Sequence, residues 1–228
     1  MKYNQIKMAL YATFLTNYLG YKLKKANSSK EKKELRLLYA KTLLGKLKLN
    51  IEIINKDKIP KDGKYLLVSN HRSVIDPLIV EIALENSNIF GNWIAKKELY
   101  NSFFFGLFVR NGGTILLDRE NSKMGTFFSD IKECTKVGES IFIFPEGTRN
   151  KTDADLGEFK DGSKIIAVKN RLNILPVYIH NQANEKLMDS LKDGKLHRTI
   201  EIEIGDIIDY KDKSMPLVDS YKKQFNLN

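Results

Sequence analysis

The sequence predicts an α/β fold in which helices flank a largely parallel, twisted β-sheet, preceded by a helical N-terminal segment. Short apolar runs of strand length alternate with helical patterns from residue 49 onwards. Such alternation is typical of a parallel sheet whose strands are connected by helices. The 228 residues suffice for one domain with a small appendage. The single cysteine excludes an intrachain disulfide framework.

Basic residues are distributed unevenly along the chain. Residues 1–48 contain twelve lysines and arginines but two acids, whereas residues 49–228 contain 26 residues of each sign. The net charge of +10 therefore belongs to the N-terminal segment. A separate basic segment indicates a polyanionic partner, either an anionic membrane or a nucleic acid. We accordingly divide the chain into residues 1–48 and an α/β domain of residues 49–228.

Residues 3–48 predict a basic, amphipathic helical hairpin. The first helix carries an apolar stripe of residues that recur every four positions: Ile6, Leu10, Phe14 and Tyr18. Ser28 or Ser29 is placed to cap a second, lysine-rich helix. The apolar stretch is shorter than the roughly 20 residues that a spanning helix needs. Two interpretations stay open: both helices pack on the body, or the hairpin lies at a membrane surface with its lysines on anionic lipid.

The body supplies the elements of the predicted sheet in order. Strands are predicted at residues 50–54, 64–69, 89–95, 113–117, 140–144, 173–179 and 198–204. Helices are predicted at residues 77–84, 121–136, 162–169 and 219–225. The last strand alternates with a period of two, as an edge strand does. In parallel sheets, reactive residues tend to lie just past the carboxyl ends of the strands.

The strand at residues 64–69 runs directly into Asn70 and His71, and Asp76 follows five positions after the histidine. A carboxylate close to an imidazole holds the ring in one tautomer and leaves its other nitrogen free to accept a proton. His71 and Asp76 are therefore candidate catalytic residues. The alternative is structural: Asp76 caps a helix that has Pro77 in its first turn, and His71 is an ordinary turn residue.

Two further strand ends carry polar side chains. The run at residues 144–149 supplies a carboxylate, a glycine, a hydroxyl and a guanidinium: Glu146, Gly147, Thr148 and Arg149. The run at residues 113–119 ends in Arg119, and an arginine fork is suited to phosphate. Either run is alternatively a turn with a surface ion pair. The sequence has no nucleophile elbow, Walker loop or dinucleotide fingerprint, which indicates direct attack by a substrate hydroxyl.

Together these strand ends resemble the sequence blocks of the glycerolipid acyltransferase family. The family's His-x4-Asp block matches residues 70–76, and its Phe-Pro-Glu-Gly-Thr-Arg block matches residues 144–149 in full. Weaker blocks resemble residues 113–119 and 174–177. The order and spacing of the blocks agree, and the resemblance covers about residues 50–180.

The resemblance implies acyl transfer from a thioester, either acyl-CoA or acyl carrier protein, to the free hydroxyl of lysophosphatidic acid in phospholipid synthesis. His71 would be the general base, oriented by Asp76. The substrate-binding residues would be Arg119, Glu146, Gly147, Thr148 and Arg149. No metal or other cofactor is expected, because a thioester carbonyl is already a good electrophile. Residues 1–48 would dock the enzyme as a peripheral or monotopic protein on the cytoplasmic face of the cell membrane, with no nucleic acid as partner.

Other functions stay open at this stage. The same chemistry suits another acceptor, such as glycerol-3-phosphate or a different lysophospholipid, and residues 150–151 and His180 depart from the family's usual pattern. A second alternative is a non-enzymatic lipid- or nucleic-acid-binding protein whose active part is the basic segment. The aromatic run at residues 100–108 has three interpretations: an acyl-chain tunnel, a bilayer contact, or a core helix between two strands.

Overall fold

The computed structural model describes residues 3–118, 124–180 and 183–227, and within them a seven-stranded sheet has the order β1-β7-β6-β2-β5-β3-β4. The strands are β1 (Leu49–Ile54), β2 (Leu66–Ser69), β3 (Gly91–Lys96), β4 (Thr114–Leu117), β5 (Ser140–Ile143), β6 (Ile174–Ile179) and β7 (Arg198–Ile204). Neighbouring strands are parallel except β6 and β7. The predicted α/β class with a largely parallel sheet is confirmed.

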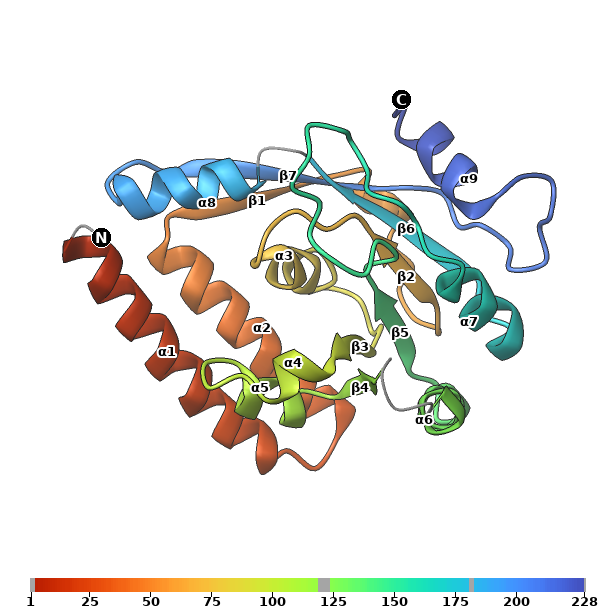
Figure 1. The fold of residues 1–228 in the computed structure, drawn as a ribbon, viewed down its shortest axis with the longest axis horizontal. Helices are drawn as coiled ribbons and strands as arrows, with labels where there is room; N and C mark the ends of the chain where they lie inside the picture. The colour runs from red at the N-terminus through yellow and green to blue at the C-terminus, as the bar shows by residue number, and fades with distance from the viewer. Residues whose placement is uncertain (1–2, 119–123, 181–182, 228) are drawn as a thin grey trace.

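Helices cover both faces of the sheet (Figure 1). One face carries α1 (Tyr3–Lys24), α2 (Ser29–Lys46), α3 (Asp76–Ala83) and α8 (Ala183–Lys192). The other carries α6 (Met124–Lys136), α7 (Gly162–Asn170) and α9 (Leu217–Gln224). The short helices α4 (Lys97–Tyr100) and α5 (Gly106–Asn111) connect β3 to β4, and a 3-10 turn, η1 (Lys56–Lys58), follows β1.

The central strand β2 shows why the sheet needs both layers. Its residues are fully buried, with Leu67 in the core under α2 and α3, and Leu66 and Val68 in the core under α6 and α7. A strand that is buried on both faces has a continuous apolar sequence, because neither set of alternate side chains meets water. The apolar run predicted as a strand is thus explained by its central position.

The prediction that residues 198–204 form an edge strand is wrong. β7 lies between β1 and β6, and the edges of the described sheet are β1 and β4. Ile200, Ile202 and Ile204 are buried, whereas Glu201 on the opposite side is exposed. The period of two therefore reports one solvated face of the sheet and not an unpaired edge.

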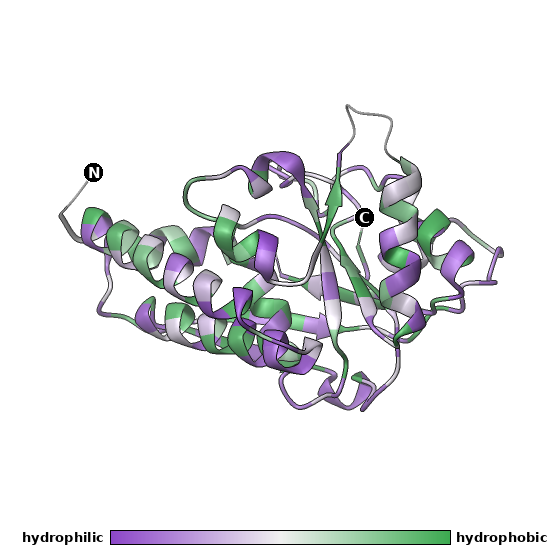
Figure 2. Cartoon of the chain, turned by 90° about the horizontal axis from the view of Figure 1, so that it is seen from below, coloured by the Kyte–Doolittle hydropathy of each residue, from purple (hydrophilic) through white to green (hydrophobic). Residues whose placement is uncertain are grey.

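The predicted helical hairpin is present, and its two helices differ. Ser28 caps α2 by accepting a hydrogen bond from the Glu31 N–H over 3.2 Å. Figure 2 shows hydrophobic and hydrophilic residues alternating along both helices. The inner faces, including Leu19 and Tyr39, pack into the same core as the sheet, so the core crosses the division at residue 48. No helix among the described residues is long and apolar enough to cross a membrane.

The aromatic run at residues 100–108 does not form the core helix that was one of its interpretations. Phe103 is 83% exposed and Phe104 is 53% exposed, in the link between α4 and α5. The following helix α5 packs on α1, where the Asn111 side chain donates to the Gly20 carbonyl over 3.2 Å. A Cβ at position 20 would lie 2.8 Å from the Phe108 nitrogen, so this close contact requires glycine.

Candidate active site

The turn after β2 brings His71 and Asp76 together. The distance from His71 Nδ1 to Asp76 Oδ2 is 2.9 Å, and the Asp76 side chain is fully buried. The same oxygen accepts the backbone N–H groups of Arg72 and Ser73, each over 2.7 Å. Because a carboxylate accepts and does not donate, Nδ1 carries the proton of a neutral ring. The other nitrogen, Nε2, makes no hydrogen bond to the described residues and is left as an acceptor.

The capping role considered for Asp76 is not what the structure shows. Asp76 is the first residue of α3, Ile75 occupies the N-cap position, and no side chain caps this end. The carboxylate instead turns back to the two N–H groups that precede the helix. Its hydrogen bonds therefore hold the His71 turn rather than the helix end.

Glu146 holds the backbone of the same turn. Its Oε1 accepts the His71 N–H over 2.7 Å, and its Oε2 accepts the Gly157 N–H over 2.7 Å. A Cβ at position 157 would lie 2.4 Å from Oε2, so this approach requires glycine. Burial raises the pKa of the Glu146 carboxyl, and the two backbone hydrogen bonds oppose that shift. Glu146 thus shapes the site from inside the protein, with both oxygens bonded to the backbone.

Asn70 and Asn150 complete this framework, and their place beside the motifs was the one signal for either role in the sequence. The Asn70 amide exchanges two hydrogen bonds with the backbone of Ile179, each over 2.7 Å, which ties the ends of β2 and β6 together. The Asn150 N–H donates to the His71 carbonyl over 2.7 Å. Both backbone groups of His71 are therefore held by the loop after β5.

Phe144 is a further residue of the site that sequence reasoning missed. Its ring stacks on the His71 imidazole with centroids 4.0 Å apart and planes 12° apart. The position of Phe144, directly after β5 and two residues before Glu146, was the available signal. Because β5 neighbours β2 in the sheet, the ends of the two strands lie side by side.

A cavity of about 250 Å³ lies beside the His71 turn, since Glu146 and Asn150 both line it and both bond the His71 backbone. Its remaining lining residues are Thr148, Arg149, Lys151, Thr152, Gly157, Glu158 and Lys160. The cavity is thus formed by the loop at the carboxyl end of β5.

The predicted phosphate ligands are placed in part. Arg149 lines the cavity, is exposed, and makes no hydrogen bond or ion pair with the described residues. Gly147 has a φ of +66°, which explains the glycine in this motif. Arg119 lies outside the described residues, so its predicted place beside Arg149 has no structural counterpart here. Its neighbour Asp118 is bonded by Lys97 over 3.0 Å.

These side chains equip the site for proton transfer next to an anion. A buried carboxylate orients a histidine whose second ring nitrogen is available, and a guanidinium faces a cavity close by. The described residues hold no cluster of three or more His, Cys, Asp and Glu side chains with the geometry of a metal site.

The chain is similar in sequence to known acyltransferases. A family model described as Acyltransferase matches residues 50–180. The chain is similar to the 1-acyl-sn-glycerol-3-phosphate acyltransferase of Helicobacter pylori, with 39% identity over 145 residues that cover 61% of this chain and 60% of that protein. The Streptococcus pneumoniae protein of the same name is 30% identical over 177 residues, covering 77% and 64%. The matches thus span less than two thirds of the length of either relative.

A solved structure is also similar. The crystal structure of the 1-acyl-sn-glycerophosphate acyltransferase from Thermotoga maritima matches with a TM-score of 0.68 over 97% of this chain and 92% of that one, at 21% identity. At this level of identity, the likeness supports the fold, including the two N-terminal helices.

Proposed function

The chain belongs to the acyltransferase family, and on that premise we propose that it transfers a fatty acyl group from a thioester to the sn-2 hydroxyl of 1-acyl-sn-glycerol-3-phosphate. The product is phosphatidic acid, a precursor in phospholipid synthesis. The observation that carries this proposal is the His71–Asp76 pair, with Nε2 unbonded among the described residues, beside a cavity lined by Arg149.

In this proposal, each group of the site has a role. Nε2 of His71 takes the proton of the acceptor hydroxyl as its oxygen attacks the thioester carbonyl, so that a C–O bond forms and the C–S bond breaks. The imidazolium is stabilised by Asp76 and returns its proton to the leaving thiolate. Arg149, together with Arg119, binds the acceptor phosphate. The donor is acyl-CoA or acyl carrier protein.

The outer face of α1 supports a membrane location. The predicted stripe is exposed, with Leu10 68% and Phe14 70% accessible, and Phe103 adds a further exposed ring. Lys22 and Lys25 lie over the rings of Tyr18 and Tyr21, at 5.0 and 4.6 Å from their centroids. Aromatic residues beside lysines suit the boundary of an anionic bilayer. The proposed location is peripheral or monotopic, on the cytoplasmic face of the cell membrane.

The proposal is tested by product analysis on the full chain with both donor types. Acceptors are lysophosphatidic acid, glycerol-3-phosphate and lysophospholipids with larger headgroups. We expect phosphatidic acid to be the main product, and Arg149→Ala to raise KM for lysophosphatidic acid by about tenfold or more, because one charge-assisted contact is worth about 1.5–3 kcal/mol.

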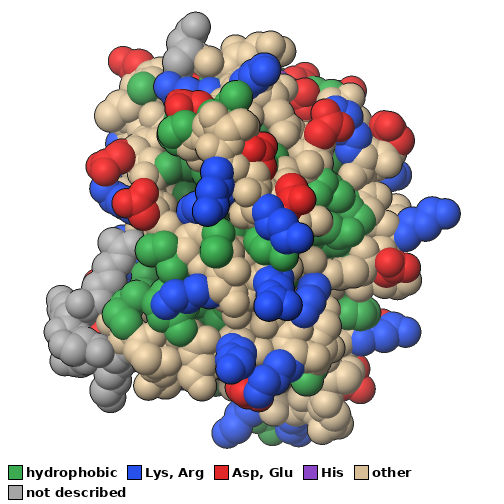
Figure 3. Space-filling view, turned by 90° about the vertical axis from the view of Figure 1, so that its right-hand side faces the viewer, with side chains coloured by type: hydrophobic (Ala, Val, Ile, Leu, Met, Phe, Trp, Pro, Cys, Tyr) green, Lys and Arg blue, Asp and Glu red, His purple; other side chains and the backbone are tan. Residues whose placement is uncertain are grey.

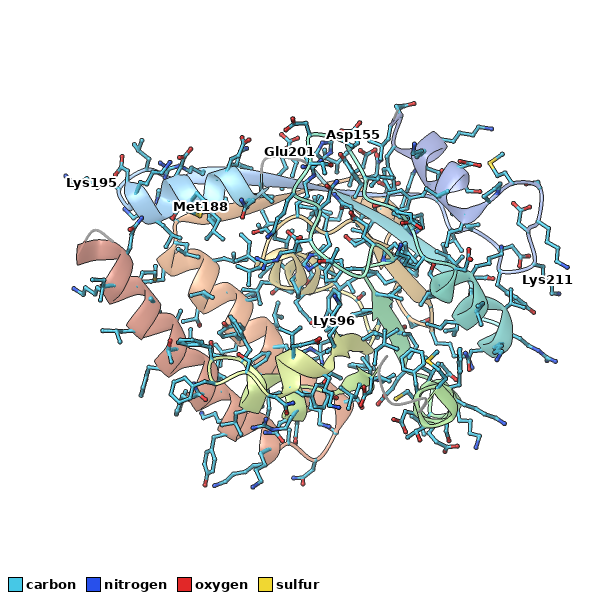
Figure 4. All side chains as sticks on the ribbon, viewed as in Figure 1. Lys96, Asp155, Met188, Lys195, Glu201 and Lys211 are labelled. Carbon is cyan, nitrogen blue, oxygen red and sulfur yellow. The ribbon has the colours of Figure 1, made fainter. Side chains whose placement is uncertain are left out.

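Lys195→Ala is the matched control, because Lys195 lies between α8 and β7, far from the loop after β5 that forms the cavity (Figure 4). If glycerol-3-phosphate or another lysophospholipid is acylated in preference, the proposed acceptor is wrong but the proposed acyl transfer stands. Absence of thioester consumption with every acceptor would overturn the proposal.

A further inference from the structure

The imidazole of His71 is constrained on one edge and on one face. Asp76 bonds Nδ1, and Phe144 stacks on the ring with planes 12° apart. A single hydrogen bond tolerates tilting of the ring plane, since rotation about the bond to the ring has a broad energy minimum. The stacked ring removes that freedom. The direction in which Nε2 points is therefore set by both neighbours.

Phe144 is itself held from behind by Trp93. The two rings stack with centroids 5.0 Å apart and planes 23° apart. Trp93 lies on β3, is 7% exposed, and donates its indole N–H to Glu81 Oε1 over 3.0 Å. A buried indole with its N–H bonded has one favoured orientation. The stack of three rings thus ends on a carboxylate of α3.

That carboxylate is shared with Arg36 of α2. Arg36 Nε donates to the same Glu81 oxygen over 2.7 Å, and both side chains are buried. The two other guanidinium nitrogens donate to the carbonyls of Gly112 and Gly91, over 2.6 and 3.0 Å. All three nitrogens of the guanidinium are bonded, so the group is immobilised at the starts of β3 and β4.

We propose that Phe144 and Trp93 are positioning residues for His71, and that the buried Arg36–Glu81 pair keeps their stack in place. The chain of direct contacts runs from α2 through Glu81, Trp93 and Phe144 to the imidazole. The second helix of the N-terminal hairpin thereby sets the orientation of the catalytic base. The inference rests on the proposed function, because it assumes that Nε2 of His71 receives the proton of the acceptor.

The kinetic test compares variants that remove a ring with one that keeps it. We expect Phe144→Leu to lower kcat by about tenfold with little change in KM, since a small misalignment of a catalytic group is costly. Trp93→Leu acts one contact further away and lowers kcat by a smaller factor. Trp93→Phe keeps a ring in the stack but loses the hydrogen bond to Glu81, so it lowers kcat by less than Trp93→Leu does. Phe127→Leu is the matched control, as a buried aromatic of the opposite core, and keeps the wild-type kcat.

A second readout reports on the ring without turnover. The Nδ1 proton of His71 is protected by Asp76 and gives a downfield imidazole N–H signal in proton NMR, which His71→Gln assigns among the three histidines. We expect this signal to weaken in Phe144→Leu and Trp93→Leu and to persist in Trp93→Phe and Phe127→Leu. An unchanged signal and unchanged kcat in folded Phe144→Leu would overturn the inference. A wild-type protein that shows the protected signal but does not acylate lysophosphatidic acid would refute the proposed function alone.

Discussion

The two helices of the N-terminal hairpin differ in composition and in the side chains that they turn outward, since α1 is mostly apolar and α2 is lysine-rich. On α1 the apolar stripe points outward, whereas on α2 two cations point inward, with Lys33 and Arg36 only 6% and 5% exposed. The basic excess is therefore not all available to a membrane. Figure 3, which shows the side of the molecule away from the hairpin, has both signs of charge spread over it. Composition identifies an unusual segment, but only the packed structure shows which of its residues are exposed and which pack into the protein.

The difference between α1 and α2 is most directly tested by removing Arg36, one of the two buried cations of α2. Arg36→Ala leaves Glu81 without its ion pair in a buried setting. Loss of one partner of a buried pair costs about 3–5 kcal/mol of unfolding free energy. Urea unfolding of Arg36→Ala, compared with Lys24→Ala on the exposed side of α1, measures the difference. Equal stability of the two variants would show that α2 is not part of the core.

Opposite faces of α1 should respond differently to the same change. Leu19→Ser places a hydroxyl in the core, since Leu19 is 1% exposed, and is expected to destabilise the fold by about 2–5 kcal/mol. Leu10→Ser leaves the unfolding free energy unchanged and weakens binding to vesicles of anionic phospholipid by about tenfold, because burying such a side chain is worth about 1.5–3 kcal/mol. Vesicle sedimentation of the Leu10→Ser protein measures this loss. Undiminished binding would refute the proposal that the exposed stripe of α1 contacts lipid.

Lys33 is expected to make a smaller contribution to the unfolding free energy, and this contribution depends on pH. Burial lowers the pKa of its ammonium below the ordinary value of 10.5, with Glu81 opposing the shift and Arg36 adding to it. The folded state therefore favours the neutral amine more than the unfolded state does. The wild type gains stability relative to Lys33→Met as the pH rises from the lowered value to 10.5. Urea unfolding of the wild type and of Lys33→Met, from neutral pH to 10.5, measures the trend, and a stability difference that does not change with pH would contradict it.

The packing of α2 changes what is expected when residues 1–48 are deleted. If residues 1–48 were an independent appendage, their deletion would leave the site intact. The structure indicates otherwise, because Tyr39 and Leu43 of α2 share the core with α3 and the sheet. Point substitutions on α1 are therefore the sharper test of membrane docking.

The sequence predicted the parts of the site whose chemistry is local. His71 and Asp76 are five positions apart, so one turn brings them together, and the strand runs were identified from their apolar patterns. Glu146 was predicted as a substrate-binding residue, but its bonds to His71 and Gly157 depend on two loops meeting, which no spacing encodes. The stack of Trp93 on Phe144 likewise depends on the order of strands in the sheet.

Three predictions outside the site differ from the structure. The alternation of β7 gave the correct exposed face but not the position of the strand in the sheet. Helix α8 was not predicted, although Ala183, Leu187 and Leu191 recur every four residues on the side that packs into the core. The aromatic run at residues 100–108 was assigned three interpretations, and the exposure of Phe103 removes the core helix.

The proposed mechanism depends most on His71 as the proton acceptor. Its decisive test is the turnover of lysophosphatidic acid by His71→Asn on anionic vesicles. We expect kcat to fall by about 10²–10⁴-fold, the range that general base catalysis supplies. Vesicle binding should match the wild type, whereas the unfolding free energy should fall by about 1–3 kcal/mol, because the bond to Asp76 and the stack on Phe144 are lost. Turnover within a few-fold of the wild type, in a folded and membrane-bound variant, would contradict the account.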